Sequence, residues 1–232
     1  MKTIYYKNLD KDLLLKLYEN FNEEYKNLSN EQKLEVYQFM KASAQKYMSV
    51  SKDAINKIDE FIKNNTIKLY EFAFKGAERE KKLASLKKYF DTAKVEQQKE
   101  NLEYFSQYDF SKRQDIFRLI YNMESDIAGV SMRTNALNTE GLFEEKVIPV
   151  EESYKQGNET EIVFQNDGII FSSFIGTKVV LASFKVISKS YVKQAQAYEA
   201  NNANLKICLD NLDKMFPEIK DDNEELDYNC SL

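Results

Sequence analysis

The sequence contains no histidine, and this absence excludes several kinds of active site. Histidine general bases, Ser-His-Asp triads, Cys-His pairs and histidine zinc sites all require the imidazole ring. The Glu-x-x-His spacing of di-iron bundles is excluded for the same reason. An enzyme would have to use Asp, Glu, Lys or Tyr as acid or base, and no spacing of these residues points to a site. We therefore predict a non-catalytic protein without a metal or other cofactor.

Proline and glycine are also scarce, with two and six residues in a chain of 232. The first proline is Pro149 and the second is Pro217, so the first 148 residues contain none. Proline removes an amide donor and clashes with the preceding helical turn, so a long proline-free stretch favours helices. A chain of this length buries roughly 70% of its unfolded surface, enough to fold without disulfides or metals.

The two cysteines, Cys208 and Cys230, match no zinc or redox spacing, and we interpret them as free thiols. The first seven residues lack the apolar core and the small-residue cleavage site of a signal peptide. We therefore expect a cytoplasmic protein, with leaderless export as the alternative.

Negative charge is concentrated at the C-terminus. The formal net charge of the chain is −5, and residues 217–232 contain six acids and one lysine, so the rest of the chain sums to zero. A neutral body argues against broad nucleic-acid binding, which requires a basic surface, although a local basic patch is compatible with it. We predict one helical-bundle domain over residues 1–216 and an acidic, disordered tail over 217–232.

Apolar residues at three- and four-residue steps predict several helices. The first covers residues 10–27. A capping box at Ser29 and Gln32 begins the second, and another capping box over residues 110–114 precedes a helix marked by Ile116 and Val130. The last helix covers residues 191–216 and ends before Pro217. The fold class is mainly α, an elongated antiparallel bundle.

Two stretches have a heptad pattern typical of helices packed along partner helices. The first runs from residue 55 to residue 93, unless a turn at residues 64–66 divides it into two antiparallel helices. The second lies in the last helix, where Asn202 is a polar residue at a seam position. Both seams are compatible with an intramolecular bundle or with binding to a partner. The proposed seam residues are Ile55, Ile58, Ile62, Leu83, Leu86, Tyr198, Asn202, Leu205, Leu209 and Leu212.

Residues 161–187 differ from the helical stretches because β-branched and aromatic residues dominate them. Asp167-Gly168 is a favourable hairpin turn, so we predict a β-hairpin or a three-stranded meander. The segment is either a packed structural element or a membrane-active hairpin. A single membrane-spanning helix is disfavoured by Lys178 and Lys185. The residues assigned to this insert are Ile162, Phe164, Ile170, Phe171, Phe174, Val180, Leu181, Phe184 and Ile187.

Long helices, an apolar hairpin and a long terminal helix follow one another in an order that resembles helical pore-forming toxins of the cytolysin A type. The resemblance covers the order of elements and no motif residue. It implies a component of a membrane-inserting toxin whose hairpin 162–187 enters the bilayer. The residues themselves favour a different function, a non-catalytic protein that acts through helix-helix contacts with a protein partner or with a second copy of itself. Nucleic acid is not an expected partner.

Overall fold

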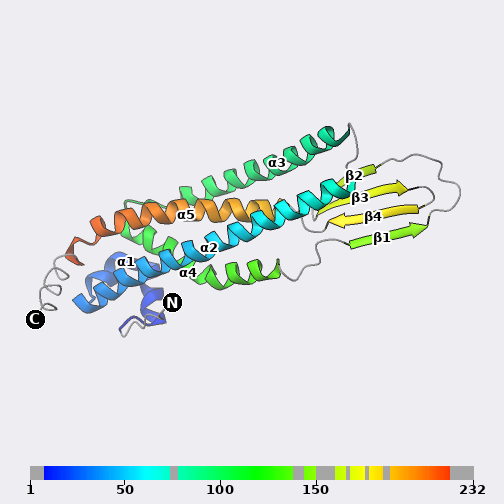
Figure 1. Cartoon of the computed structure of the whole chain (residues 1–232). Coiled ribbons are helices and arrows are strands. Elements are labelled where there is room, and N and C mark those ends of the chain that lie inside the picture. The colour runs from blue at the N-terminus through cyan, green and yellow to red at the C-terminus, as the bar shows by residue number, and fades with distance from the viewer. Residues whose placement is uncertain are drawn as a thin grey trace, which may run out of the picture. The chain divides into compact units, whose positions relative to one another are not determined.

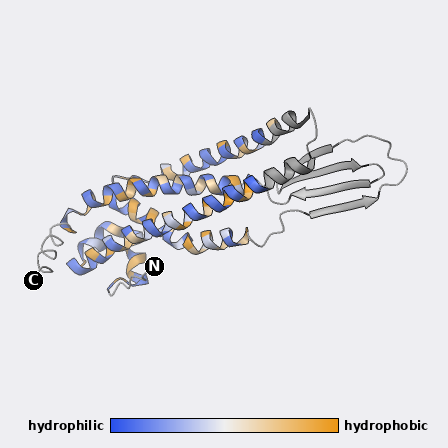
Figure 2. Cartoon of the chain, viewed as in Figure 1, coloured by the Kyte–Doolittle hydropathy of each residue, from blue (hydrophilic) through white to orange (hydrophobic). Residues whose placement is uncertain are grey.

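A computed structural model describes the backbone of residues 8–73, 78–137, 144–149, 160–165, 168–175, 178–184 and 189–219. Side chains are described for residues 8–64, 84, 87–137 and 189–219. The described chain is mainly helical, which confirms the predicted helical bundle (Figure 1). Figure 2 shows hydrophobic and hydrophilic residues alternating along the helices. The helices are α1 (Lys11–Lys26), α2 (Asn30–Ala73), α3 (Glu78–Ser106), α4 (Arg113–Ala136) and α5 (Lys189–Met215).

Hydrogen bonds between backbone amides and nearby side chains cap the first turns of α1 and α2. Asp10 caps α1 by accepting the amide of Leu13 at 2.8 Å. Before α2, the amide of Gln32 donates to Ser29 Oγ at 3.2 Å, and the amide of Ser29 donates to Gln32 Oε1 at 3.0 Å. This reciprocal pair confirms the predicted capping box, which satisfies two amides that a helix start otherwise leaves free.

The second predicted capping box, over residues 110–114, is wrong. Ser111 Oγ donates to Asp109 Oδ1 at 2.6 Å rather than accepting an amide of α4. These bonds from the hydroxyl and amide of Ser111, together with Lys112, lower the pKa of Asp109 to about 2. Gln114 is engaged elsewhere, with α1. The Asp-x-Ser sequence therefore forms a local turn and leaves the glutamine side chain free for a tertiary contact.

Helix α2 passes through residues 64–66 without a break, so the turn considered there is wrong. Its first part has a regular buried stripe that includes the small residues Ser51 and Ala54. Ile58 belongs to this stripe, and the neighbouring seam candidates Ile55 and Ile62 are half-buried beside it. Steps of four and three residues separate its members, which are Met40, Ala44, Tyr47, Ser51, Ala54, Ile58 and Phe61.

The chain divides into two compact units. The first comprises residues 1–52, 103–130 and 199–232, and the second comprises residues 53–102 and 131–198. The expected elongated shape and the single domain over residues 1–216 stay predictions. Within the described part of the predicted tail, Pro217–Ile219 form a helical turn with Ile219 buried; residues 220–232 lie outside the described residues.

An aromatic core holds the first unit together. Phe21 is fully buried, and its ring centroid lies 5.2 Å from that of Phe117 and 6.3 Å from that of Phe216. These three residues come from α1, from α4 and from the position directly after α5. Aromatic side chains each bury a large apolar area, and such tilted and edge-on pairs add about 0.5–1.5 kcal/mol beyond it.

Helix α1 is kinked within this unit. Asn20 has φ −144° and ψ 70°, which interrupts the helical hydrogen bonds. The amide of Phe21 donates instead to Gln114 Oε1 at 2.6 Å, and Gln114 Nε2 donates to the carbonyl oxygen of Tyr18 at 2.9 Å. Arg118 Nε donates to the same carbonyl at 2.8 Å. Side chains of α4 therefore satisfy the backbone groups that the kink releases.

A polar layer joins α2 and α5 in the first unit. Asn201 Nδ2 donates to the hydroxyl oxygen of the buried Tyr47 at 2.6 Å. Ser51 Oγ donates to Asn202 Oδ1 at 2.7 Å. Tyr37 pairs with Asp213 further along, so the two helices run antiparallel here. Buried polar groups need such partners, and a paired polar layer favours one register of two helices.

The second unit has a smaller described core. Ala54, Ile58 and Phe61 of α2 are buried, as are Val192 and Tyr198 of α5. The hydroxyl of Tyr198 accepts a hydrogen bond from Arg133 Nε at 3.0 Å. A tyrosine can be buried at little cost when its hydroxyl is paired in this way.

The described residues of the second unit also include four strands, which form one antiparallel sheet in the order β1-β4-β3-β2. In the register, Phe171 lies opposite Ile162 on one side and opposite Ala182 on the other. The side chains of these strands lie outside the described residues. The strands are β1 (Glu144–Pro149), β2 (Thr160–Gln165), β3 (Gly168–Ile175) and β4 (Lys178–Phe184).

Candidate functional site: the outward face of α3

Helix α3 has 29 residues, and few of its described side chains are buried. It contains neither proline nor glycine, and charged residues of both signs that favour helices recur along it. Among its described side chains, Ala93 alone is buried. Most helical stability in proteins comes from packing an apolar face. Over residues 87–106, where its side chains are described, α3 therefore has a face that does not pack against the rest of the described chain.

Polar contacts hold α3 to α5 within the second unit. Lys193 Nζ lies 2.9 Å from Glu100 Oε1 and 3.3 Å from Glu96 Oε2, and Lys189 Nζ lies 3.3 Å from Glu96 Oε1. Asn101 Nδ2 donates to the carbonyl oxygen of Gln196 at 3.2 Å. The residue numbers of the bonded partners increase together along both helices, so α3 and α5 are parallel here. The predicted antiparallel arrangement therefore does not hold for this pair of helices.

These ion pairs shift the titration of their members. Hydrogen bonds from Lys193 and Lys189 lower the pKa of Glu96, and the hydrogen bond to Glu100 raises the pKa of Lys193. Both shifts favour the charged forms. The acids on this side of α3 are therefore engaged with α5.

The other side of α3, its outward face, exposes two aliphatic residues. Val95 is 52% exposed and Leu102 is 69% exposed. They are seven positions apart, so they lie on the same side of the helix about 10.5 Å apart along its axis. Both side chains are far more exposed to water than the core residues of a helical bundle. Burying them against another apolar surface would be favourable, because it removes apolar area from water.

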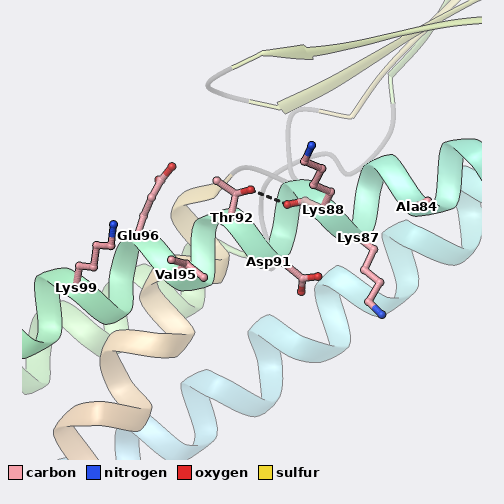
Figure 3. A pocket seen from close by; sticks show the side chains of 8 residues that line it. All are labelled: Ala84, Lys87, Lys88, Asp91, Thr92, Val95, Glu96 and Lys99. Carbon is pink, nitrogen blue, oxygen red and sulfur yellow. Dashed lines mark hydrogen bonds between the residues drawn. The ribbon is translucent and has the colours of Figure 1, made fainter.

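An open hollow of about 530 Å³ lies along α3; it follows the outward face at Val95 and reaches Glu96, which is paired with α5. Figure 3 shows that its labelled side chains all project from α3, with Lys88, Thr92 and Glu96 toward one edge and Lys87 and Asp91 toward the other. The dashed contact is a bond from Thr92 Oγ1 to the carbonyl of Lys88, internal to the helix. The described lining residues are Ala84, Lys87, Lys88, Asp91, Thr92, Val95, Glu96 and Lys99.

A charged cluster at the end of α5 holds the first unit together. Arg113 donates to both carboxylate oxygens of Glu218, at 2.9 and 3.3 Å, and its guanidinium lies 4.6 Å from the ring centroid of Phe216. The hydroxyl of Tyr25 donates to Glu218 Oε1 at 3.1 Å. Partial burial raises the pKa of Glu218, but its backbone amide and Arg113 outweigh this and leave that pKa lowered. The cluster fixes the helical turn after α5, and each member has a structural partner.

No metal or nucleophile site emerges from the described residues. They contain no group of three His, Cys, Asp or Glu residues that could hold a metal ion. Burial raises the pKa of Cys208 to about 12, which keeps this thiol protonated and unreactive. Over the same residues, none of the helices combines the length and the apolar character needed to span a membrane.

The predicted seam residues are distributed between core and surface. Ile58, Tyr198, Leu205 and Leu212 are buried. Ile55, Ile62, Asn202 and Leu209 are half-buried. The side chains of Leu83 and Leu86 lie outside the described residues, as do those of every residue assigned to the insert.

Sequence reasoning missed Val95 and Leu102. The predicted heptad frame ends near Ala93 and follows the side of α3 that packs inward. Two isolated aliphatic residues among charged ones give no periodic signal. Their seven-residue spacing was available in the sequence, but only the structure assigns them to solvent.

Comparison with known proteins gives no relative for this chain: no protein-family model matches it, and neither the curated proteins nor the solved structures yield a match.

Proposed function

We propose that this protein is a non-catalytic interaction protein that binds a protein partner, or a second copy of itself, through helix-helix contacts. One observation carries the proposal: the exposed Val95 and Leu102 on a helix whose described side chains include one buried residue, Ala93. Isolated exposed aliphatic residues are common on protein surfaces. Here two of them share one face of a long helix, and Val95 also lines an open hollow, which supports binding of another helix.

Site-specific photo-crosslinking of the full chain tests this function. A photoreactive residue at position 95 or 102 should form discrete covalent adducts, with a partner protein or with a second copy, in cell extract and at native concentration. The same residue at Lys206, an exposed position of α5, is the matched control. Light scattering of the purified chain separates self-association from binding to another protein. Equal adduct yields at all three positions, or no adducts at any of them, would contradict the proposal.

A second candidate function concerns the segment 161–187, which we propose to be a β-rich insert that enters a membrane. Support comes from the antiparallel pairing of β3 with both β2 and β4, because a bilayer offers backbone groups no water to bind. Side chains alternate between the two faces of a strand, and in β3 both sets of positions contain apolar residues, with Phe171 in one and Phe174 in the other. A sheet with one solvated face would instead have mainly polar residues in one of the two sets.

Dye release from liposomes tests the second candidate. The full chain should release an entrapped dye, and the double substitution F171D/F174D should abolish release while leaving the far-ultraviolet circular dichroism spectrum unchanged. An absence of binding and leakage over a range of lipid compositions and pH values would exclude this function.

A further inference from the structure

We infer that the outward face of α3 binds an acidic amphipathic helix of a protein partner. The inference rests on the proposed helix-helix function and specifies the chemistry of the partner. Its basis is the distribution of charge around Val95 and Leu102.

Lysines dominate the exposed charge of this face. Lys87, Lys88, Lys94 and Lys99 are all exposed, and within the described part of the chain the structure gives none of them a carboxylate partner. Asp91 lies among them, and the exposed Glu103 lies four residues after Lys99, so the lysines outnumber the acids. The face is therefore basic although residues 1–216 of the chain are neutral overall.

The acids of α3 that would neutralise these lysines point to another element. Glu96 and Glu100 are held by Lys189 and Lys193 of α5. Two cations from α5 thus compensate the acids of α3 on the inward side. The lysines on the outward side keep their uncompensated charge, which is the arrangement that attracts an acidic partner.

Three of the four lysines lie at the flanks of a helix-helix contact. At 100° per residue, Val95 and Leu102 lie on one line of α3, and Lys88 lies on the same line seven positions before Val95. Lys87 and Lys94 lie on one side of this line and Lys99 lies on the other. In paired helices the flanking positions form interhelical ion pairs that select the partner. A partner with apolar residues on its seam and glutamates on its flanks would complement both features.

Other occupants fit this face less well. A second copy of α3 would bring the same lysines into contact, and like charges at flanking positions repel. A lipid surface would need a wider apolar face for insertion, whereas the line through Val95 also contains Asp91 and Gln98. An acidic protein helix avoids the repulsion between lysines and needs a narrower apolar contact than a lipid surface does.

A pair of synthetic peptides tests the inference on the full chain. Both peptides contain four heptads with leucine at the seam positions; one has glutamate at every flanking position and the other has lysine. Fluorescence anisotropy measures the binding of each labelled peptide. We expect saturable binding of the acidic peptide and at least about tenfold weaker binding of the basic one, because the flanking charges discriminate between partners. Raising the salt concentration should weaken the acidic complex.

Two matched variants locate the binding. K87E/K94E should weaken binding of the acidic peptide by about tenfold or more and strengthen binding of the basic one. K11E/K16E makes the same change in net charge at exposed positions of α1 and should leave both affinities unchanged. Anionic phosphatidylglycerol vesicles are the third probe. Binding of vesicles that K87E/K94E abolishes, with no binding of either peptide, would overturn the inference in favour of a lipid surface.

The outcomes separate this inference from the proposed function. If V95Q/L102Q weakens binding of both peptides alike, and K87E/K94E changes neither, the helix-binding function stands and the acidic partner is wrong. If neither peptide binds, the acidic partner is also wrong, and the photo-crosslinking experiment alone decides the broader function. Equal effects of K87E/K94E and K11E/K16E would reduce the result to a general effect of net charge and overturn the inference.

Discussion

The core of the first unit and helix α3, most of which belongs to the second unit, differ in how their side chains are packed. In the first unit the rings of Phe21, Phe117 and Phe216 are fully buried and lie against one another. Helix α3 buries Ala93 among its described side chains and contacts α5 mainly through ion pairs. Pattern and length alone therefore do not assign a helix to the core. Substitutions in these two regions should have different effects on stability.

The largest expected effect comes from the aromatic core. Phe216→Ala should lower the free energy of unfolding by about 3–5 kcal/mol, because it removes a fully buried ring and leaves a cavity. Denaturant unfolding followed by circular dichroism measures the loss. Val95→Ala, on the exposed face of α3, should change the same free energy by less than about 0.5 kcal/mol. Equal losses in the two variants would contradict the contrast between the regions.

The kink of α1 provides the next test. Gln114→Ala removes the acceptor for the amide of Phe21 in a partly buried site and should cost about 1–3 kcal/mol. Gln98→Ala changes an exposed glutamine of α3 and is the matched control, with no expected loss. If both variants unfold at the same denaturant concentration as the parent chain, the side chains of α4 do not support the kink.

A smaller effect concerns pH and the ion pair of Glu218. The pKa of Glu218 is lowered in the folded chain, so the carboxylate contributes stability above its unfolded pKa and loses that contribution as pH falls through the folded value. Glu218→Gln should therefore be less stable than the parent at about pH 7, and the difference should shrink below about pH 4.5. Unfolding midpoints at neutral and acidic pH test this. A difference that is constant with pH would mean that charge is not the cause.

The smallest expected effect on stability belongs to the proposed binding surface. V95Q/L102Q should leave the free energy of unfolding within about 0.5 kcal/mol of the parent, because both side chains are already exposed. Thermal unfolding of the two chains at equal concentration measures the change. A loss of several kcal/mol would show that the outward face of α3 is part of the core.

Helices and local caps were predictable because their causes lie within a few residues. The capping box at Ser29 depends on Gln32, three residues away, and it forms as predicted. The apolar positions of α4 from Ile116 to Val130 were identified from spacing, and they are buried.

Features that depend on distant residues were not predictable. The kink at Asn20 is supported by Gln114 and Arg118, more than ninety residues further along the chain. The polar layer similarly joins Ser51 to Asn202. The seam position of Asn202 was visible in the sequence, but its partner was not, because a serine in a helix usually predicts solvent exposure.

The exposure of individual side chains was the property of the candidate site that the sequence predicted least well. The buried stripe of α2 continues through Ser51 and Ala54, whose small side chains give a weak hydrophobic signal. Conversely, Val95 and Leu102 are apolar and yet exposed. Burial depends on which helices lie alongside, and that information resides in tertiary contacts rather than in the local pattern.

Amide hydrogen exchange of the full chain, with and without the acidic heptad peptide, tests most directly whether α3 binds a partner helix. We predict slower exchange in the peptide complex over residues 87–102 of α3, with the amides around Phe117 in the first unit unchanged. Exchange that is unaltered in α3 at saturating peptide, or slowed equally in both regions, would contradict the assignment of this face as the binding surface.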